Sequence, residues 1–490
     1  MKESRTARRR SPRARLWVTL SVCALLPVTQ AVAQKAAAAP RSSGVAQKKS
    51  TWVVRPEWVE AHERFLSSDV MHGRGSATRD EQITATYVAS EFMAYRLTIA
   101  PGMTGYIQSA EVVSPTLSGN ATLTVGNVTL NEGNDFHLLM ASDVPVTAQL
   151  VKVLPENLAQ AHTKGAVVLV GGDPQKAMGS ATQLLRAGAA VVLVPASAAT
   201  DAMSTRLGGR TRVGIRLKDS PQPEVARDIV VLTAAAAARL ESENDGATAT
   251  LAIQVVPQAG PRMTYNAIGY LQGTDPSAGT ILLSAHLDHL GIGRPVKGDS
   301  IYNGANDDAA GTTAVMELAH ALAAGPRLRR SILFVCYGSE EIGDLGSTYF
   351  GEHPPIPLTS LVANVEFEMI GNQDPKMPKG TLLFTGWERS NLGPALKAHG
   401  ALLGPDPYPE EHFFERSDNY ALALKGVVAH TAAGWGTPPT YHQPDDEFSR
   451  LNIPFMTSAI QSLIDPLRWL ATSDFKPAWN AGGQPERGGR

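Results

Sequence analysis

The sequence predicts an α/β protein in which helices cover both faces of a sheet, with a β-rich insert. Three observations predict this fold. Residues 264–472 alternate short apolar runs typical of strands with runs typical of helices. Residues 56–98 place apolar side chains at three- and four-residue steps, as helices do. Between these regions, residues 105–258 change to short β-like runs separated by turn residues, with few charged or aromatic side chains.

Each element of the α/β region is a distinct run. Strands are expected at 267–273, 281–288, 331–339, 362–371, 382–386 and 427–432. Helices are expected at 309–324, 391–400 and 453–470, after the earlier helical region at 56–98. The segment 72–75, which contains two glycines, is expected to be a loop.

Composition and charge restrict the class of protein. The chain has 490 residues, of which 43% are hydrophobic and 18% charged, as expected for a folded protein of two or three domains. Its net charge is −2, although the first 33 residues hold seven basic side chains and one acidic. The remainder therefore carries −2 − 6 = −8, which argues against nucleic-acid binding. With only two cysteines, the chain has neither a disulfide framework nor a thiolate zinc site.

The N-terminus has the pattern of an export signal. A basic stretch is followed by the apolar run LWVTLSVCALLPV at 16–28 and by Ala31-Val32-Ala33. This order is typical of a secretory signal with cleavage after Ala33, and thirteen apolar residues are too few to span a bilayer. We therefore expect a secreted or periplasmic protein with no membrane anchor after cleavage.

These patterns divide the chain into five parts. We expect a signal peptide at 1–33, a flexible leader at 34–55, a catalytic domain at 56–104 and 259–472, an insert domain at 105–258 and a disordered tail at 473–490.

Five polar clusters lie at or after the ends of the predicted strands. They are 286–289, 303–311, 340–341, Glu366 with Glu368, and 441–446. In an open α/β sheet, sites form at the carboxyl ends of the strands. Carboxylates crowded at one sheet edge repel one another unless cations hold them, and imidazole with carboxylate is a ligand set suited to zinc, manganese or cobalt. The sequence therefore predicts a metal site.

The clusters occur in the order SAHLDH, NGANDDAAG, GSEEIGDLGS, FEMIGN and YHQPDDE. This order resembles the co-catalytic di-zinc aminopeptidase family, which includes secreted bacterial leucyl aminopeptidases, plasma glutamate carboxypeptidase and glutamate carboxypeptidase II. The resemblance covers about 264–472. It implies the zinc-exopeptidase three-layer sandwich, a mixed central sheet with helices on both faces. The insert resembles a protease-associated domain, on the runs Lys164-Gly165-AVVLV and Leu185-Arg186-Ala187-Gly188-Ala189-AVVLV.

The resemblance also implies roles for individual residues. Asp307 would bridge two zinc ions; His286 and Glu368 would complete the protein ligands of one ion, and Glu341 and His442 those of the other. Glu340 would be the general base. The chain departs from the family at two positions. Relatives commonly have Asp at the position of Glu368, and Asn306 replaces an acidic residue before Asp307.

Asp288 is expected to support the first histidine. It lies two residues after His286 on an extended segment, so the two side chains share a face and Asp288 can hold the second imidazole nitrogen. The oxyanion donor stays open: relatives often place a tyrosine before the Ser-Asp pair that Ser417 and Asp418 resemble, whereas this chain has phenylalanines there. Tyr302 and Tyr441 are alternative candidates.

The leading functional hypothesis is a zinc aminopeptidase acting on peptides. The alternatives are a carboxypeptidase or dipeptidase on the same metals, a one-zinc glutaminyl cyclase, and a receptor-like scaffold whose metal site has decayed. Near the predicted site the cations Arg294, Lys297, Arg389 and Arg416 are scattered singly, whereas acidic groups that could bind a substrate ammonium are more plentiful: Glu366, Asp418, Asp445, Asp446 and Glu447. Side-chain preference and oligomeric state stay open.

Overall fold

The computed structural model describes residues 52–144, 146–207, 211–221, 226–256 and 259–486. The expected signal segment and most of the expected leader lie outside these residues. Within the described residues, every helix is too short or too polar to cross a membrane.

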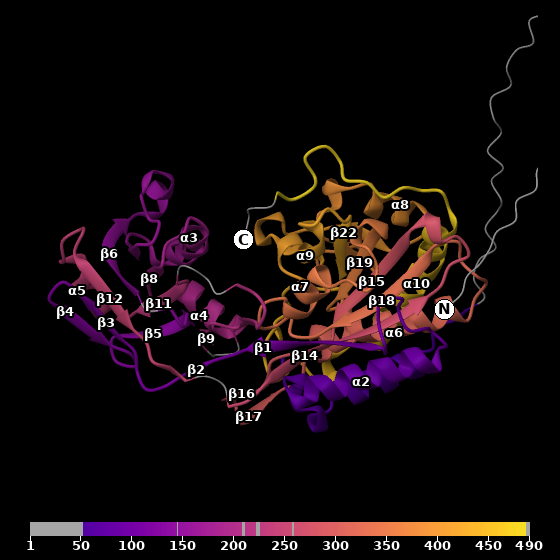
Figure 1. Cartoon of the computed structure of the whole chain (residues 1–490), viewed down its shortest axis with the longest axis horizontal. Coiled ribbons are helices and arrows are strands. Elements are labelled where there is room, and N and C mark those ends of the chain that lie inside the picture. The colour runs from indigo at the N-terminus through magenta and orange to yellow at the C-terminus, as the bar shows by residue number, and fades with distance from the viewer. Residues whose placement is uncertain (1–51, 145, 208–210, 222–225, 257–258, 487–490) are drawn as a thin grey trace, which may run out of the picture. The chain divides into compact units, whose positions relative to one another are not determined.

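The described residues form two large sheets and the helices around them (Figure 1). The helices are α1 (Pro56–Leu66), α2 (Arg79–Ala94), α3 (Pro174–Arg186), α4 (Ala198–Arg206), α5 (Ala234–Glu241), α6 (Ala310–Ala323), α7 (Leu345–Glu352), α8 (Leu392–Ala398), α9 (Asn419–Ala423) and α10 (Ile453–Thr472). A 3₁₀ segment, η1 (Asp69–Arg74), joins α1 to α2.

One nine-stranded sheet is built mainly from the expected catalytic domain, in the order β10-β1-β14-β18-β15-β19-β22-β20-β21. Two of its strands, β1 and β10, come from residues that we expected in the insert. Its strands are β1 (Ile107–Val113), β10 (Arg216–Leu217), β14 (Arg262–Leu271), β15 (Thr280–His286), β18 (Ser331–Tyr337), β19 (Leu361–Glu368), β20 (Leu382–Phe384), β21 (Leu403–Pro405) and β22 (Ala429–Ala433). Strands β18, β15, β19 and β22 run parallel, while β1, β14 and β20 pair antiparallel with neighbours. The expected mixed sheet is confirmed.

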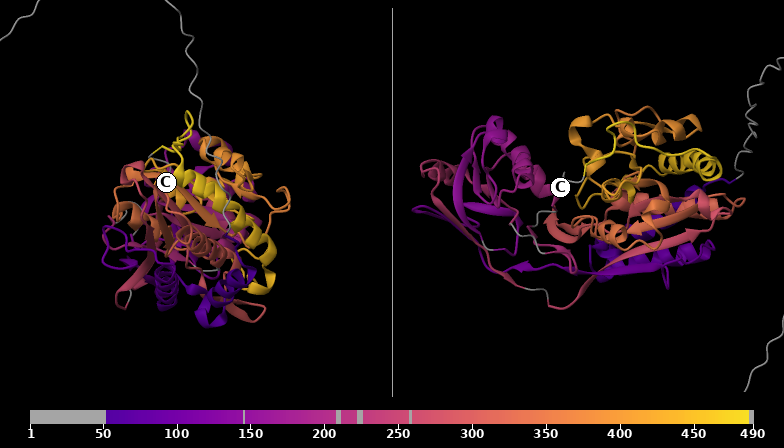
Figure 2. Two further views of the ribbon diagram at one scale, coloured as in Figure 1. Left: turned by 90° about the vertical axis from the view of Figure 1, so that its right-hand side faces the viewer. Right: turned by 45° about the horizontal axis from the view of Figure 1, so that its top comes forward.

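Both faces of this sheet are buried. Along β15, Ile281 and Leu283 join one apolar core with residues of α1, α2, α6 and α10. Leu282, between them, joins a second core with residues of α7 and α9. Since strand side chains alternate between faces, these two cores are the two interfaces of a three-layer sandwich. The long helix α10, yellow in Figure 2, packs against α6 and α1.

The second nine-stranded sheet lies in the expected insert, in the order β4-β3-β12-β6-β7-β8-β11-β5-β9. Its strands are β3 (Thr122–Val125), β4 (Val128–Asn131), β5 (Phe136–Ala141), β6 (Val146–Val153), β7 (Val167–Val170), β8 (Val191–Pro195), β9 (Arg212–Val213), β11 (Asp228–Leu232) and β12 (Thr248–Ala252). The run β6-β7-β8-β11 is parallel, and the predicted β-like runs AVVLV form β7 and β8. Two small ladders complete the strands: β2 (Thr116–Leu117) with β13 (Val255–Val256), and β16 (Gly291–Val296) with β17 (Asp299–Tyr302).

Two segments that we expected to lack structure are ordered where they are described. Before α1, Val54 is buried and its backbone N–H donates to Gln461 of α10 over 2.8 Å. After α10, Trp479 pairs with Ser390 in a β-bridge, and its indole donates to the carbonyl of Gly426. Both corrections have one cause: an aromatic or apolar side chain in a polar segment gains a buried contact that composition alone does not indicate.

Candidate metal centre

The strand order brings four of the five polar clusters to one edge of the catalytic sheet. His286 is the last residue of β15 and pairs in register with Tyr337, the last residue of β18. Glu340 and Glu341 follow β18 directly, and Glu368 ends β19, the other parallel neighbour of β15. Parallel strands end at the same edge, so these clusters converge there.

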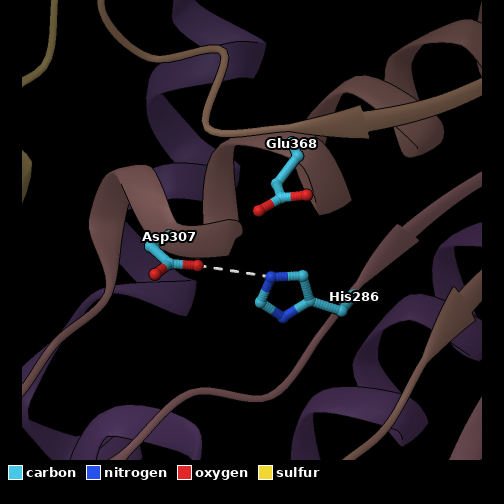
Figure 3. Close-up of side chains that lie close together, drawn as sticks. All are labelled: His286, Asp307 and Glu368. Atoms are coloured by element: carbon cyan, nitrogen blue, oxygen red, sulfur yellow. Dashed lines mark ion pairs between the residues drawn. The ribbon is translucent and has the colours of Figure 1, made fainter. Parts of the chain in front are cut away.

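The first ligand group consists of His286, Asp307 and Glu368. Their side chains point toward a common space, and His286 Nε2 lies 3.2 Å from Asp307 Oδ1 (Figure 3). One ligand atom from each lies within 4.8 Å of the others, which is close enough to hold one metal ion. The three residues come from β15, from the loop before α6 and from β19.

The second group shares Asp307 with the first. His442 Nε2 lies 3.1 Å from Asp307 Oδ2 and 3.2 Å from Glu341 Oε2. His289 also enters this group: its Nδ1 is 2.7 Å from Glu341 Oε1. The structure thus brings all five expected ligand residues together and adds a third histidine.

The electrostatics of the two groups favour bound cations. Burial would raise the pKa of Asp307, but hydrogen bonding to His286 and His442 outweighs burial and holds this pKa well below its ordinary value. Burial would also raise the pKa of Glu341, and here too the nearby His442 and His289 lower it overall. Asp307 Oδ2 is buried without a well-aligned hydrogen bond among the described residues, as expected for an atom that awaits a cation.

Asp288 does not hold His286 in the way we expected. Its carboxylate lies 3.8 Å from His286 Nδ1, and the nearer atom is the Asp288 backbone carbonyl at 3.3 Å. The carboxylate instead accepts hydrogen bonds from the Ser76 hydroxyl at 2.5 Å and from the backbone N–H groups of Glu340 at 3.0 Å and Glu341 at 3.3 Å. Asp288 therefore positions the Glu340-Glu341 turn.

Asp446 supports the bridging residue from behind. This buried carboxylate accepts hydrogen bonds from the backbone N–H of Asn306 at 3.1 Å and of Asp307 at 3.0 Å. Asp446 is among the acidic groups that the sequence offers as partners of a substrate ammonium. Its oxygens instead accept hydrogen bonds from the backbone of the loop that carries Asp307. Nothing in the sequence distinguishes it from the neighbouring Asp445, which is exposed.

Arg74 is a second supporting residue that sequence reasoning missed. Its guanidinium is fully buried and donates to four backbone carbonyls: Leu66 at 2.8 Å, Leu287 at 3.0 Å, Asn303 at 2.7 Å and Gly304 at 2.8 Å. It therefore ties the end of α1 to the segments that follow β15 and precede Asp307. The flanking glycines marked a loop, but no local pattern indicated a buried arginine.

The remaining candidate residues, Glu366, Tyr302 and Tyr441, differ in what their side chains contact. Glu366 is buried and accepts hydrogen bonds from the Ser417 hydroxyl at 3.2 Å and from the Asn419 backbone N–H. The hydroxyl of Tyr302 donates to the carbonyl of Arg294 at 3.0 Å, so it is not aimed at the metal groups. Tyr441 stacks on His442 with ring centroids 3.9 Å apart and stays the better candidate for an oxyanion donor.

A small cavity of about 30 Å³ adjoins the first ligand group. Glu368 and Tyr441 line it, together with Phe413 and Arg416. The Arg416 guanidinium lies 3.3 Å from Glu411 Oε2 and stacks over the Phe413 ring at 4.8 Å.

A mixed sheet whose parallel strands end in two carboxylate-histidine groups with one shared aspartate defines a site of the metallopeptidase class. Residues 266–464 match the family model "Peptidase family M28". The resemblance that the motifs indicated, and the class of metallopeptidase, are confirmed at the level of the family.

Named relatives are similar over parts of their length. The chain is 26% identical over 221 residues to probable leucine aminopeptidase 2 of Aspergillus oryzae, covering 39% of this chain and 41% of the relative. It is 30% identical over 156 residues to Aminopeptidase YwaD of Bacillus subtilis, covering 30% and 34%. The chain thus spans less than half the length of these relatives.

Solved structures share the fold over most of their length. The aminopeptidase from Aneurinibacillus sp. strain AM-1 superposes with a TM-score of 0.55 at 18% identity, covering 86% of this chain and 94% of the other. BSAP, a zinc aminopeptidase from Bacillus subtilis, superposes with a TM-score of 0.53 at 17% identity, covering 89% and 99%. At these identities the likeness supports the fold, and the expected fold class is confirmed.

Proposed function

We propose that this chain is an exported di-zinc exopeptidase that releases residues from the amino end of peptides. The observation that carries the proposal is the sharing of Asp307 between two ligand groups, His286 with Glu368 and His442 with Glu341. Export rests on the signal-like pattern of the first 33 residues and stays a prediction.

The donor atoms support zinc. A tetrahedral zinc with ligands about 2.0–2.2 Å away holds neighbouring ligand atoms roughly 3.3–3.6 Å apart. The pairs that involve Asp307, His286, His442 and Glu341 are 3.1–3.2 Å apart, close to this spacing. The receptor-like alternative predicts a decayed site, which the complete set of donors argues against.

The chain's own residues divide the work of hydrolysis. When bound, two zinc ions polarise a scissile carbonyl and acidify the attacking water. Glu340 lies beside the ligand Glu341, is only half-buried, and has its backbone held by Asp288. Burial raises the pKa of Glu340 well above its ordinary value, opposed by His286, so its carboxylate can accept the proton of the water and pass it to the leaving amine.

The proposal that cleavage starts from the amino end, and not the carboxyl end, rests on the cations near the site. A carboxypeptidase binds its substrate's carboxylate with a free cation, and arginine is suited to bind it bidentately. Arg416, the cation that lines the cavity beside Glu368, is paired with Glu411 and stacked on Phe413. This pairing supports cleavage from the amino end, in agreement with the names of the relatives.

A carboxypeptidase or dipeptidase is the second candidate, because Arg416 does line that cavity and a substrate carboxylate could displace Glu411. The acidic groups near the site give the substrate ammonium less support than their number in the sequence indicates, since Glu366, Asp418 and Asp446 are buried.

The test uses one peptide in three forms: free, N-acetylated and C-amidated, with products identified by mass spectrometry. We expect acetylation to abolish cleavage and amidation to leave it largely intact. Arg416→Gln should then leave the turnover of the free peptide within about threefold. The opposite pattern, with amidation abolishing cleavage and Arg416→Gln raising KM for the free peptide, would make the protein a carboxypeptidase.

A further inference from the structure

His289 is a third histidine beside the second ligand group. It is fully buried, and its Nδ1 lies 2.7 Å from Glu341 Oε1 but 3.9 Å from Asp307 Oδ2. The other oxygen of Glu341 lies 3.2 Å from His442 Nε2. The Glu341 carboxylate is therefore held between two imidazoles.

The surrounding backbone fixes the position of the His289 ring. Its backbone N–H donates to the Arg74 carbonyl at 3.1 Å, and its carbonyl accepts from the Ser76 N–H at 3.2 Å. Gly304 packs directly against the ring: a Cβ there would lie 2.5 Å from His289 Cγ, and the positive φ of +60° at Gly304 also favours glycine. The ring also meets His442 edge to face, with centroids 5.6 Å apart.

Such a histidine can act in two ways: as a further metal ligand, or as a hydrogen-bond donor to the carboxylate that binds the metal. The distances distinguish these two roles. Two ligands of one tetrahedral zinc lie roughly 3.3–3.6 Å apart. The His289–Glu341 distance of 2.7 Å is well short of this range and matches a charge-assisted N–H···O hydrogen bond, for which about 2.7–2.9 Å is usual.

We infer that His289 is a positioning residue, whose Nδ1–H donates to Glu341 Oε1 and thereby turns Oε2 toward the second metal. Nε2 has no hydrogen-bond partner among the described residues. The inference rests on the proposed function in one respect: it requires that the second group binds a metal.

The test compares His289→Asn with His289→Leu. The Asn side-chain amide places an N–H donor near the position of Nδ1, but its nitrogen does not bind zinc, whereas Leu removes both properties. Zinc affinities are measured by titration against a chromophoric chelator, on protein whose fold is checked by circular dichroism. His430→Gln is the matched control, because His430 is equally buried but bonds only Ser390 and Thr385.

We expect the unmodified chain, the control and His289→Asn to bind two zinc ions with affinities within about threefold. His289→Leu should weaken one of the two sites by about 10–100-fold, the usual effect of removing a partner of a ligand. If His289→Leu does not fold, His289→Ala removes the donor without adding bulk.

Two results would overturn the inference while leaving the proposed function intact. Equal weakening in Asn and Leu would identify His289 as a ligand, and native affinity in Leu would remove it from the site. An unmodified, folded chain that binds no zinc would instead overturn the proposed function and, with it, any metal-positioning role for His289.

Discussion

Glu340 and Glu341 are adjacent in the chain yet occupy opposite electrostatic environments. The two histidines near Glu341 overcome the effect of burial and lower its pKa, so it stays a carboxylate, as a ligand must. Burial raises the pKa of Glu340, and the neighbouring Glu341 adds to this although His286 opposes it. In the proposed mechanism, one turn thus presents a metal ligand and a proton acceptor side by side.

Glu340→Gln tests this division. The amide keeps the shape of the side chain but cannot take a proton, so we expect kcat to fall by at least ~10²-fold, in line with general acid–base contributions, while KM and zinc content change little. Glu388→Gln, at an exposed glutamate, is the control. Near-native kcat in Glu340→Gln would remove this residue from the mechanism.

His430 makes stability depend on pH. It is buried, and its Nδ1 lies 2.8 Å from the Thr385 carbonyl while its Nε2 lies 2.7 Å from the Ser390 hydroxyl. Burial lowers its pKa from 6.5 to about 4. The unfolded chain therefore binds a proton that the folded chain refuses, and the stabilisation present above pH 6.5 is lost as pH falls toward 4.

The shift corresponds to about 3 kcal/mol at most. His430→Gln should therefore lose less stability than the unmodified chain between pH 7 and pH 4.5, by about that amount, in urea titrations of the zinc-free protein. Parallel loss in both proteins would contradict the role given to His430.

The motifs predicted the residues of the two ligand groups, but not the residues that hold these groups in position. His286, Glu340, Glu341 and Glu368 could be recognised because each stands at or just after the end of an apolar run. Asp307 stands in the polar cluster that leads into a predicted helix, and His442 in the polar cluster after the last predicted strand. The supporting roles of Arg74, His289 and Asp446 could not be recognised, because most of their partners are backbone groups or side chains more than 50 residues away. Such contacts follow from the fold and have no local pattern.

At the scale of elements, the alternation of runs predicted six of the nine strands of the catalytic sheet, with ends within five residues; β1, β10 and β21 were not predicted. The predicted strand 281–288 is β15 at Thr280–His286, and the predicted helix 309–324 is α6 at Ala310–Ala323. The errors lie at strand ends, where Leu287 and Asp288 leave the ladder to form the site. Apolar character continues there, since Leu287 is buried, but the strand does not.

Arg74 links the end of α1 to the segment after β15 and to the segment before Asp307. Its loss should weaken both folding and metal binding. Arg74→Met leaves four buried carbonyls without their donor, and a hydrogen bond from a charged group is worth about 1.5–3 kcal/mol. We expect the free energy of unfolding to fall by more than about 3 kcal/mol, and zinc affinity to fall with it.

Arg74→Lys keeps the cation but reaches fewer carbonyls. Its free energy of unfolding should therefore lie between those of the unmodified chain and Arg74→Met. Urea unfolding monitored by circular dichroism gives the comparison. If Arg74→Lys and Arg74→Met are equally close to the unmodified chain, the guanidinium does not join these elements.

The insert at 105–258 stays a prediction as a protease-associated domain that limits access of substrate. Its described residues have two apolar cores of their own, which supports a unit that folds by itself. The ligand groups found in the described residues lie outside it. Substituting Asp173→Ala and Gln175→Ala at the start of α3 should therefore leave zinc content unchanged; any effect should appear in KM or peptide-length preference. Loss of zinc in a folded variant would contradict this picture.

At the scale of the whole molecule, the proposed function depends on one shared residue. Asp307 lies between elements that are far apart in sequence: β15 and β19 on one side, and the segments that carry Glu341 and His442 on the other. A protein with two independent metal sites would lose one metal at a time whichever ligand was removed. A protein with a bridging carboxylate should lose both when that carboxylate is removed.

The central claim is therefore tested most directly by counting zinc per chain in three variants by elemental mass spectrometry, after dialysis against trace zinc. The unmodified protein should contain about two zinc ions per chain. Glu368→Ala and His442→Ala should each retain about one zinc ion, and Asp307→Ala close to none. Circular dichroism should show that every variant is folded, and every variant should be inactive on the free peptide. Full zinc content or turnover in folded Asp307→Ala would contradict the account.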